Sequence, residues 1–216
     1  MLDIEYAELT DTGKTREHNE DSLGHVIPAT TAEVQSQGWL FAIADGVGGQ
    51  EHGEIASRLA IDTVVSGFRK IPKGIMHVSL LPRLVQEANA AVYDAATAGP
   101  SRGQTSRMGT TLVACALRFD SAVVSHVGDS RCYLYREGVG IQLTSDHTMA
   151  ANRCAWACSR RTMLSPVTIV MYSLAAWVMN SSSLQIPRLS MSSLATFCCS
   201  AQTASMAMCR RGRFSN

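Results

Sequence analysis

The chain has 216 residues, the size of a single domain, and its formal net charge is +1. A nearly neutral chain has no strong electrostatic attraction for nucleic acid or an anionic membrane, so neither partner is expected. No run reaches the roughly 18 apolar residues that a membrane span needs. Asp3 and Glu5 follow Met1 so closely that no signal peptide is predicted. We therefore expect a cytoplasmic protein.

The first 148 residues show apolar segments separated by polar and glycine-containing turns, as in a domain of mixed helices and strands. Apolar runs predict strands over 7–10 and 40–44, the second of them central because it is almost wholly apolar. Apolar residues at helical spacing predict helices over 53–68 and 80–96. A polar loop follows over 100–105. Three further strands are predicted over 110–117, 121–126 and 132–136.

The composition changes after His147. Residues 148–216 contain no Asp and no Glu, although Arg, Ser, Met, Cys and Trp are abundant. A soluble domain normally carries charges of both signs, and a basic arm is usually Lys-rich and poor in Trp, Cys and Leu. We therefore divide the chain into a folded N-terminal part, 1–148, and an aberrant tail, 149–216.

The cysteine pattern favours neither disulfides nor a zinc site. Cys115 and Cys132 lie in strand-like apolar runs, where a reduced and buried thiol is common. The other cysteines lie in the tail, and they lack paired CxxC spacing and a histidine partner.

Three acidic motifs stand out in the N-terminal part: REHNED at 16–21, DGVGG at 45–49 and GDSR at 128–131. A carboxylate at a strand end, followed by glycine, can face a metal ion that the backbone also approaches closely. Carboxylate and carbonyl oxygens are hard ligands that suit Mg²⁺ or Mn²⁺. Each motif alone is also typical of a plain turn or a hairpin loop, so the specificity comes from their combination.

Four segments carry a family resemblance: TDTGKTREHNEDS, FAIADGVGGQEHGEIAS, MGTTLVACAL and VSHVGDSRCYLYREGVGIQLTSDHT. They resemble the bacterial branch of the metal-dependent protein phosphatases, the PPM family, over residues 1 to about 148. The resemblance implies an α+β fold, a four-layer α-β-β-α sandwich of two antiparallel sheets, here incomplete on its C-terminal side. It implies hydrolysis of phosphoserine and phosphothreonine on proteins by a metal-activated water. The implied cofactors are two Mn²⁺ or Mg²⁺ ions and a more weakly held third.

The resemblance also implies roles for individual residues. Asp45 would bridge two metal ions, and the carbonyl of Gly46 would bind one of them. Asp21 would hold a metal-bound water, with Glu20 in the same network. Asp129 would bind the third ion.

Arg16 would grip the substrate phosphate through bidentate, charge-assisted hydrogen bonds. No nucleophilic side chain is then needed. Cys115, the candidate for a rival thiol mechanism, lies in an apolar strand that disfavours a reactive thiolate. Val47 stands where eukaryotic members carry a histidine thought to act as a general acid, so the leaving group must be protonated by another group or by water.

Two further aspartates of the family's site, one in a Ser-Asp-Gly motif and one in an Asp-Asn motif, are missing from the tail. We hypothesise that the tail is a frameshifted translation. The peptide FCCSAQTAS at 197–205, read two bases later with permitted codons, gives the missing LLLCSDGL. A genuine but divergent tail is the alternative. Losing the second half would leave sheet edges unpaired and apolar faces exposed, so we expect an unstable chain with little activity.

Two other functions stay open. The chain could be a non-catalytic pseudophosphatase that binds a phosphoprotein or a metal, or a metal-dependent nuclease or other phosphoesterase. The near-neutral charge disfavours the nuclease. The expected partners are phosphorylated protein substrates, with a Ser/Thr kinase among them, and the expected state is a monomer.

Overall fold

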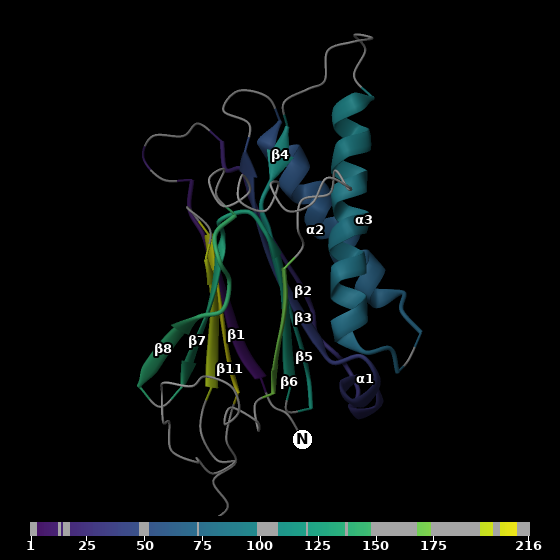
Figure 1. The fold of residues 1–216 in the computed structure, drawn as a ribbon, viewed down its shortest axis with the longest axis vertical. Helices are drawn as coiled ribbons and strands as arrows, with labels where there is room; N and C mark the ends of the chain where they lie inside the picture. Colours follow the sequence, from purple (N-terminus) through teal and green to yellow (C-terminus); the bar gives the residue numbers. More distant parts are fainter. Residues whose placement is uncertain are drawn as a thin grey trace, which may run out of the picture.

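The chain folds as two antiparallel sheets packed face to face, with helices outside one of them, in a computed structural model (Figure 1). The structure describes residues 4–12, 14, 18–47, 52–72, 74–98, 108–119, 121–136, 138–147, 168–173, 195–200 and 204–210. No helix within these ranges is long and apolar enough to cross a membrane. The predicted α+β architecture of two antiparallel sheets is confirmed.

The described strands fall into two sheets. The first sheet has the order β1 (Ile4–Thr10), β11 (Ala204–Arg210), β10 (Ala195–Ser200), β7 (Arg131–Arg136), β8 (Val139–Gln142). The second sheet has the order β2 (Asp21–Val26), β3 (Trp39–Val47), β5 (Leu112–Arg118), β6 (Ser121–Val127), β9 (Thr168–Ser173), with the short β4 (Gly109–Thr110) paired to β3.

The helices are α1 (Thr31–Ser36), α2 (Gly53–Arg69) and α3 (His77–Thr97). A capping box starts α1: the Thr30 hydroxyl accepts the Glu33 N–H, and the Glu33 carboxylate accepts the Thr30 N–H. Helices α2 and α3 pack on each other and cover the outer face of the second sheet (Figure 1). In the described part of the chain, the first sheet has no comparable helix layer.

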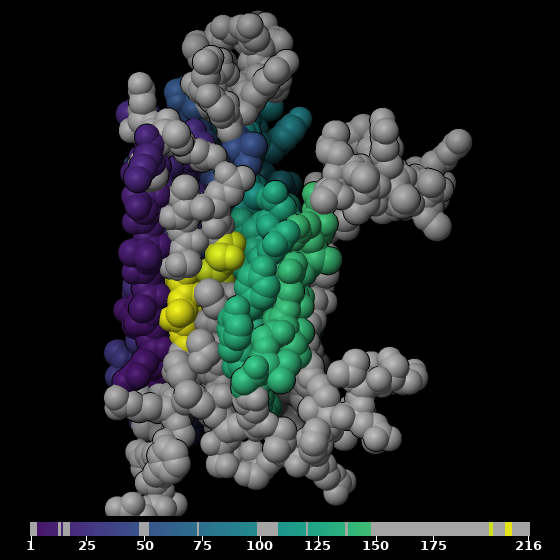
Figure 2. Space-filling model, turned by 90° about the vertical axis from the view of Figure 1, so that its left-hand side faces the viewer, coloured from purple at the N-terminus to yellow at the C-terminus, as the bar shows by residue number. Residues whose placement is uncertain are grey.

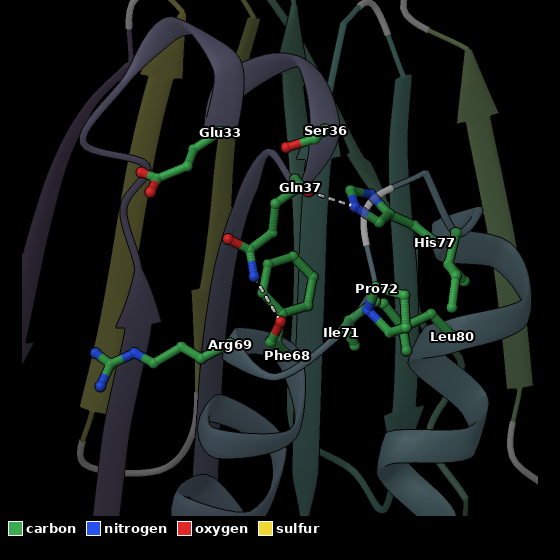
Figure 3. Close-up of a pocket in the computed structure, with 10 residues that line it drawn as sticks. Glu33, Ser36, Gln37, Phe68, Arg69, Ile71, Pro72, His77 and Leu80 are labelled. Atoms are coloured by element: carbon green, nitrogen blue, oxygen red, sulfur yellow. Dashed lines mark hydrogen bonds between the residues drawn. The ribbon is translucent and has the colours of Figure 1, made fainter.

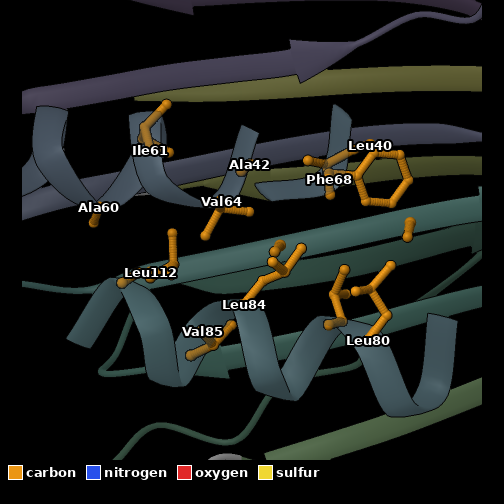
Figure 4. Packing of buried hydrophobic residues seen from close by; sticks show 14 of the residues in the cluster. Leu40, Ala42, Ala60, Ile61, Val64, Phe68, Leu80, Leu84, Val85 and Leu112 are labelled. Carbon is orange, nitrogen blue, oxygen red and sulfur yellow. The ribbon is translucent and has the colours of Figure 1, made fainter. Parts of the chain in front are cut away.

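Strand β3 is almost wholly apolar because both of its faces are buried. Phe41 and Ile43 belong to the core between the two sheets. Leu40 and Ala42 alternate with them and face the helices, where they meet side chains such as Phe68 (Figure 4). The strand therefore joins two apolar cores, and its C-terminal end carries the Asp45-Gly46 motif.

The structure confirms the predicted central strand and both predicted helices. Their ends differ from the expected ranges by at most three residues. The strands expected over 7–10, 110–117, 121–126 and 132–136 also exist, and residues 110–117 divide into β4 and β5. The sequence did not predict β2, α1 or β8, and the expected loop at 100–105 lies outside the described residues. Strand β2 was missed because it is an edge strand of mixed polarity whose side chains are mostly half-buried.

Three of the described strands, β9, β10 and β11, lie after residue 148. Their neighbours in the first 148 residues are β6, β7 and β1, respectively, and β10 also pairs with β11. In Figure 2 the coloured tail residues (yellow) lie between β1 (purple) and the green strands that include β7. The side chains of Cys199, Met206 and Met208 are buried in the core between the sheets. This differs from the expectation that sheet edges and inner faces lose their partners, because tail strands pair with both sheets and alternate apolar side chains of β11 fill core positions. The domain boundary near residue 148 stays a prediction.

Candidate metal centre

Asp21 and Asp45 are direct cross-strand partners in the antiparallel pair of β2 and β3. Residues that face each other across such a pair have their side chains on the same side of the sheet. Alternation from Ile43 places Asp45 on the face that lines the space between the sheets, and Leu23 packs on the same core. Both carboxylates therefore lie at one end of the sandwich on its inner face, and Asp45 is only 5% exposed.

Two threonines hold the backbone of Asp45. The Asp45 carbonyl accepts the N–H of Thr111 at 2.8 Å and the hydroxyl of Thr110 at 3.0 Å. The Asp45 N–H donates to the hydroxyl oxygen of Thr111 at 3.1 Å. The Thr111 hydroxyl thus takes the place of the backbone carbonyl that would normally accept the Asp45 N–H in the sheet. Both the N–H and the carbonyl of Asp45 are therefore hydrogen-bonded.

Glu20 lies against the glycines that follow Asp45. The Gly46 N–H donates to the Glu20 carbonyl at 3.0 Å. A Cβ atom on Gly53 would lie 3.0 Å from the carboxyl carbon of Glu20, and one on Gly46 would collide with the Gly53 carbonyl. The start of α2 and the end of β3 therefore pack at backbone distance, which only glycine permits at position 46, whereas a Cβ atom at position 53 would displace the Glu20 carboxylate.

The turn that carries Asp129 is fixed from two sides. Gly128 has φ +100°, a conformation that other residues rarely adopt, and it exchanges hydrogen bonds with His147: its N–H donates to Nδ1 at 3.3 Å, and its carbonyl accepts the His147 N–H at 3.0 Å. Arg131 makes a bidentate ion pair with Asp146, at 2.9 Å from Nε to Oδ1 and 2.6 Å from Nη2 to Oδ2. Asp129 itself is exposed.

Two pKa shifts accompany this turn. The hydrogen bonds from Arg131 lower the pKa of Asp146, so this carboxylate stays ionised. Burial lowers the pKa of His147, and the nearby His126, stacked on it at 4.6 Å between ring centroids, adds to the effect. His147 is therefore neutral at pH 7, which leaves its Nδ1 able to accept the Gly128 N–H.

The structure brings together Asp21, Asp45, Gly46 and Glu20, all expected from the sequence, at one end of the sandwich. Arg16 lies outside the described residues. Among the residues that the structure describes, no three His, Cys, Asp or Glu side chains gather as a ready cation site. The donors present, carboxylates with a nearby backbone carbonyl, suit a hard divalent cation in type, although they form only part of a coordination shell.

The sequence did not assign roles to Thr110, Thr111 or His147. Each lies in a segment that carried the resemblance, MGTTLVACAL or LTSDHT, but hydroxyls and imidazoles that contact backbone atoms leave no recognisable spacing. The sequence feature that could have pointed to the two threonines is their position next to each other directly before an apolar strand. The pairing of β3 with β4 and β5 then places them beside Asp45.

Cys115 is fully buried in the core between the sheets, and this burial raises the pKa of its thiol well above the usual value. Such a thiol is not a phosphatase nucleophile. His18 and His52 are both exposed, as expected for surface residues.

A hollow lies near the C-terminal end of α2. The rise per residue of an α-helix places this end about 22 Å from Gly53, where the helix begins. Gln37, Phe68 and His77 are among the residues that line it (Figure 3). The Gln37 side chain donates to the Phe68 carbonyl at 2.6 Å, and His77 Nε2 donates to the Gln37 carbonyl at 2.7 Å. These polar side chains join the ends of the three helices, so the hollow is a structural joint remote from the carboxylates.

Comparisons with known proteins agree with this geometry. Residues 14–170 match the family model described as protein phosphatase 2C. The chain is 32% identical over 143 residues to the serine/threonine phosphatase stp of Listeria innocua, a match of 65% of this chain and 53% of that protein. It is 34% identical over 147 residues to the serine/threonine protein phosphatase PstP of Mycobacterium tuberculosis, a match of 68% of this chain and 26% of that protein.

Among solved structures, the catalytic domain of PstP in complex with 2 manganese ions superposes with a TM-score of 0.65 at 21% identity, over 97% of this chain and 98% of that one. This likeness supports the fold. The chain spans about half the length of the Listeria relative and a quarter of PstP. The family match covers well over half of the chain, and the chain therefore belongs to the protein phosphatase 2C family.

Proposed function

We propose that the complete form of this protein is a metal-dependent phosphatase that hydrolyses phosphoserine and phosphothreonine on proteins. The observation that carries the proposal is the Asp21–Asp45 cross-strand pair on the inner face of the sandwich. Relatives named serine/threonine phosphatase support the reaction, and the PstP domain described with 2 manganese ions supports a pair of Mn²⁺ or Mg²⁺ ions. Bound divalent cations would supply Lewis acidity toward the phosphate and lower the pKa of water.

The chain's own residues divide the work of binding and orientation. Asp45 and the Gly46 carbonyl would hold the cations, Asp21 would orient water through its carboxylate, and Glu20 would support it. Asp129 would take a third ion that is bound more weakly. Arg16 would clamp the substrate phosphate, because a guanidinium presents two parallel N–H donors to phosphate oxygens.

This chain as written is proposed to be impaired. It supplies few of the acidic ligands that a closed cation site needs, since residues 148–216 contain no Asp or Glu. Strand β10 ends at Ser200, which pairs with Arg131 beside Asp129, and β11 begins opposite Thr10. In the shifted reading frame the peptide LLLCSDGL would begin within β10, at position 197, and place its aspartate just beyond the end of this strand. The frameshift thus accounts for the missing ligand at the position where the fold would use it.

Two measurements test these proposals. Sequencing the DNA across codons 140 to 216 decides the frameshift: a shifted frame interrupted by stops, or one without the LLLCSDGL peptide, would reject it. Phosphopeptide hydrolysis with Mn²⁺ is then compared between this chain and the frame-restored chain, with Asp45→Asn in the restored chain as the inactive control.

We expect Mn²⁺-dependent turnover only in the restored chain. Failure of the restored chain would overturn the phosphatase proposal, whereas efficient turnover by this chain as a folded monomer would overturn its impairment. Mn²⁺ binding without turnover in the restored chain would favour a pseudophosphatase. Phosphorylated proteins as substrates, a Ser/Thr kinase among them, a monomeric state and a cytoplasmic location belong to the same proposal.

A further inference from the structure

Thr111 contacts both the Asp45 strand and the Asp129 turn. It lies between β4 and β5, opposite Asp45, and it is 5% exposed. Its hydroxyl oxygen accepts the Asp45 N–H at 3.1 Å and shares a hydrogen bond of 2.7 Å with the hydroxyl of Ser130. Ser130 is equally buried and directly follows Asp129. Two acidic positions that are 84 residues apart in sequence, 45 and 129, are therefore linked through a single side chain.

The turn also packs on the carbon atoms of Thr111. A Cβ atom on Gly128 would lie 2.7 Å from the Thr111 methyl group and 2.8 Å from its Cβ. Residues 128 and 130 thus contact Thr111 on its methyl side and its hydroxyl side, and Asp129 lies between them. The backbone of the turn cannot move relative to β3 without breaking one of these contacts.

A second set of contacts holds the turn from the opposite side. His147 exchanges hydrogen bonds with Gly128, and His126 Nε2 donates to the carbonyl of Ser145 at 2.9 Å. These contacts fix the turn to the segment that follows β8, but they do not reach Asp45. The hydroxyl of Thr111, by contrast, contacts both the Asp45 backbone and the residue after Asp129.

We propose that Thr111 is a positioning residue, which sets the separation between Asp129 and Asp45 and thereby controls how tightly this end of the sandwich binds a divalent cation. The proposal rests on the cation-binding role given above to Asp45 and Asp129. Residues that orient metal ligands, without binding the metal, commonly change affinity on the order of 10–100-fold when they are replaced.

The test is a Mn²⁺ titration, followed by electron paramagnetic resonance of the free ion, on the full chain and on three variants. Thr111→Val keeps the shape of the side chain and removes the hydroxyl. Thr111→Ser keeps the hydroxyl. Thr144→Val is the matched control, because the Thr144 hydroxyl is also 5% exposed and accepts a backbone N–H, that of Cys132, at 3.1 Å. Thermal unfolding without metal is measured for all four proteins.

We expect Thr111→Val to bind Mn²⁺ at least about tenfold more weakly, Thr111→Ser to stay within about threefold of the parent, and Thr144→Val to match the parent. Both valine variants should lose similar thermal stability, so a purely structural role would not separate them. Equal Mn²⁺ affinity in Thr111→Val and the parent would overturn the inference while leaving the proposed reaction intact. Absence of Mn²⁺ binding by the parent would also overturn the inference, and would leave the proposed reaction to be decided by the frame-restored chain. Phosphopeptide turnover by the frame-restored chain is read independently and decides only the reaction.

Discussion

Asp21 and Asp45 face each other across the antiparallel pair of β2 and β3, with both carboxylates on the inner side of the sandwich. Like charges directly opposite on a sheet destabilise it, so this register weakens the fold unless a cation lies between or beside the carboxylates. The pair lies where the apolar strand β3 approaches its end and the mixed-polarity strand β2 begins. The cost to stability and the proposed capacity to bind a cation would then arise from one pair of residues.

Neutralising one carboxylate should therefore have opposite effects with and without metal. We expect Asp21→Asn to raise the free energy of unfolding of the metal-free chain by about 0.2–1 kcal/mol, since a like-charge pair is removed. In millimolar Mn²⁺ the parent should gain stability by mass action, whereas the variant should gain little. Urea unfolding with and without Mn²⁺ measures both effects.

Asp94→Asn is the control for Asp21→Asn, because Asp94 is exposed on α3. It should leave both the metal-free stability and the Mn²⁺ response unchanged. An equal Mn²⁺ response in Asp21→Asn and the parent would show that this carboxylate does not contribute to cation binding.

Gly46 and Gly109 are nearly opposite each other on β3 and β4, yet they should respond differently to alanine. A Cβ atom on Gly46 would collide with the Gly53 carbonyl and lie 2.8 Å from that of Glu20, so backbone must shift. A Cβ atom on Gly109 would meet only the Val47 carbonyl, at 3.8 Å, an ordinary contact. We expect Gly46→Ala to cost about 1–3 kcal/mol and Gly109→Ala less than about 0.5 kcal/mol in urea unfolding. Similar costs would contradict the close packing of β3 against α2.

The sequence predicted β3 because a long apolar run can only be a strand buried on both faces or a buried helix, and Asp45-Gly46 ends it as a strand would end. It predicted α2 and α3 from their apolar spacing. It did not predict β2, since the half-buried edge strand mixes Asp21 and His25 with a glycine and shows no clean alternation.

For the candidate site, Asp45 stood out because it precedes a glycine at a strand end, and the roles of Glu20, Asp21 and Asp129 came from the family resemblance of their segments. The Asp21–Asp45 register was not predicted, because register depends on strand pairing that neither segment encodes alone. Thr111 was missed for the same reason: its role exists only once β5 lies beside β3 and the turn at Asp129 folds onto it. Tail segments entered the first sheet because alternate apolar residues such as Met206 and Met208 are sufficient to fill a core position.

The buried cysteines of the core should be unreactive in the folded chain. Burial raises the pKa of Cys115, and Cys199, whose Sγ lies 3.3 Å from that of its cross-strand partner Cys132, also has a raised pKa, from this contact and from burial. Because the thiolate is the reactive species, iodoacetamide at pH 7.5 should label Cys115 and Cys199 only after urea unfolding. Peptide mass spectrometry with and without urea checks this, and rapid labelling of Cys199 without urea would contradict the burial of β10.

His77 should make the stability of the chain depend on pH near neutrality. Its ring lies at the start of α3 and donates from Nε2 to the Gln37 carbonyl (Figure 3), and burial lowers its pKa from the ordinary value of 6.5. Below pH 6.5 the unfolded chain takes up a proton on this residue before the folded chain does. The stability that His77 contributes is therefore complete above pH 6.5 and declines as the pH falls toward the lower pKa of the folded state.

His77→Gln removes the titrating ring and keeps an N–H donor that can reach the Gln37 carbonyl. We expect the loss of unfolding free energy between about pH 7.5 and about pH 5.5 to be smaller in this variant than in the parent, because the remaining histidines titrate equally in both. His18→Gln, a replacement at an exposed position, should keep the pH dependence of the parent. Urea unfolding of the three proteins at both pH values measures the difference. If His77→Gln and the parent lose the same free energy, the imidazole is not held in its neutral form by the joint between α1, α2 and α3.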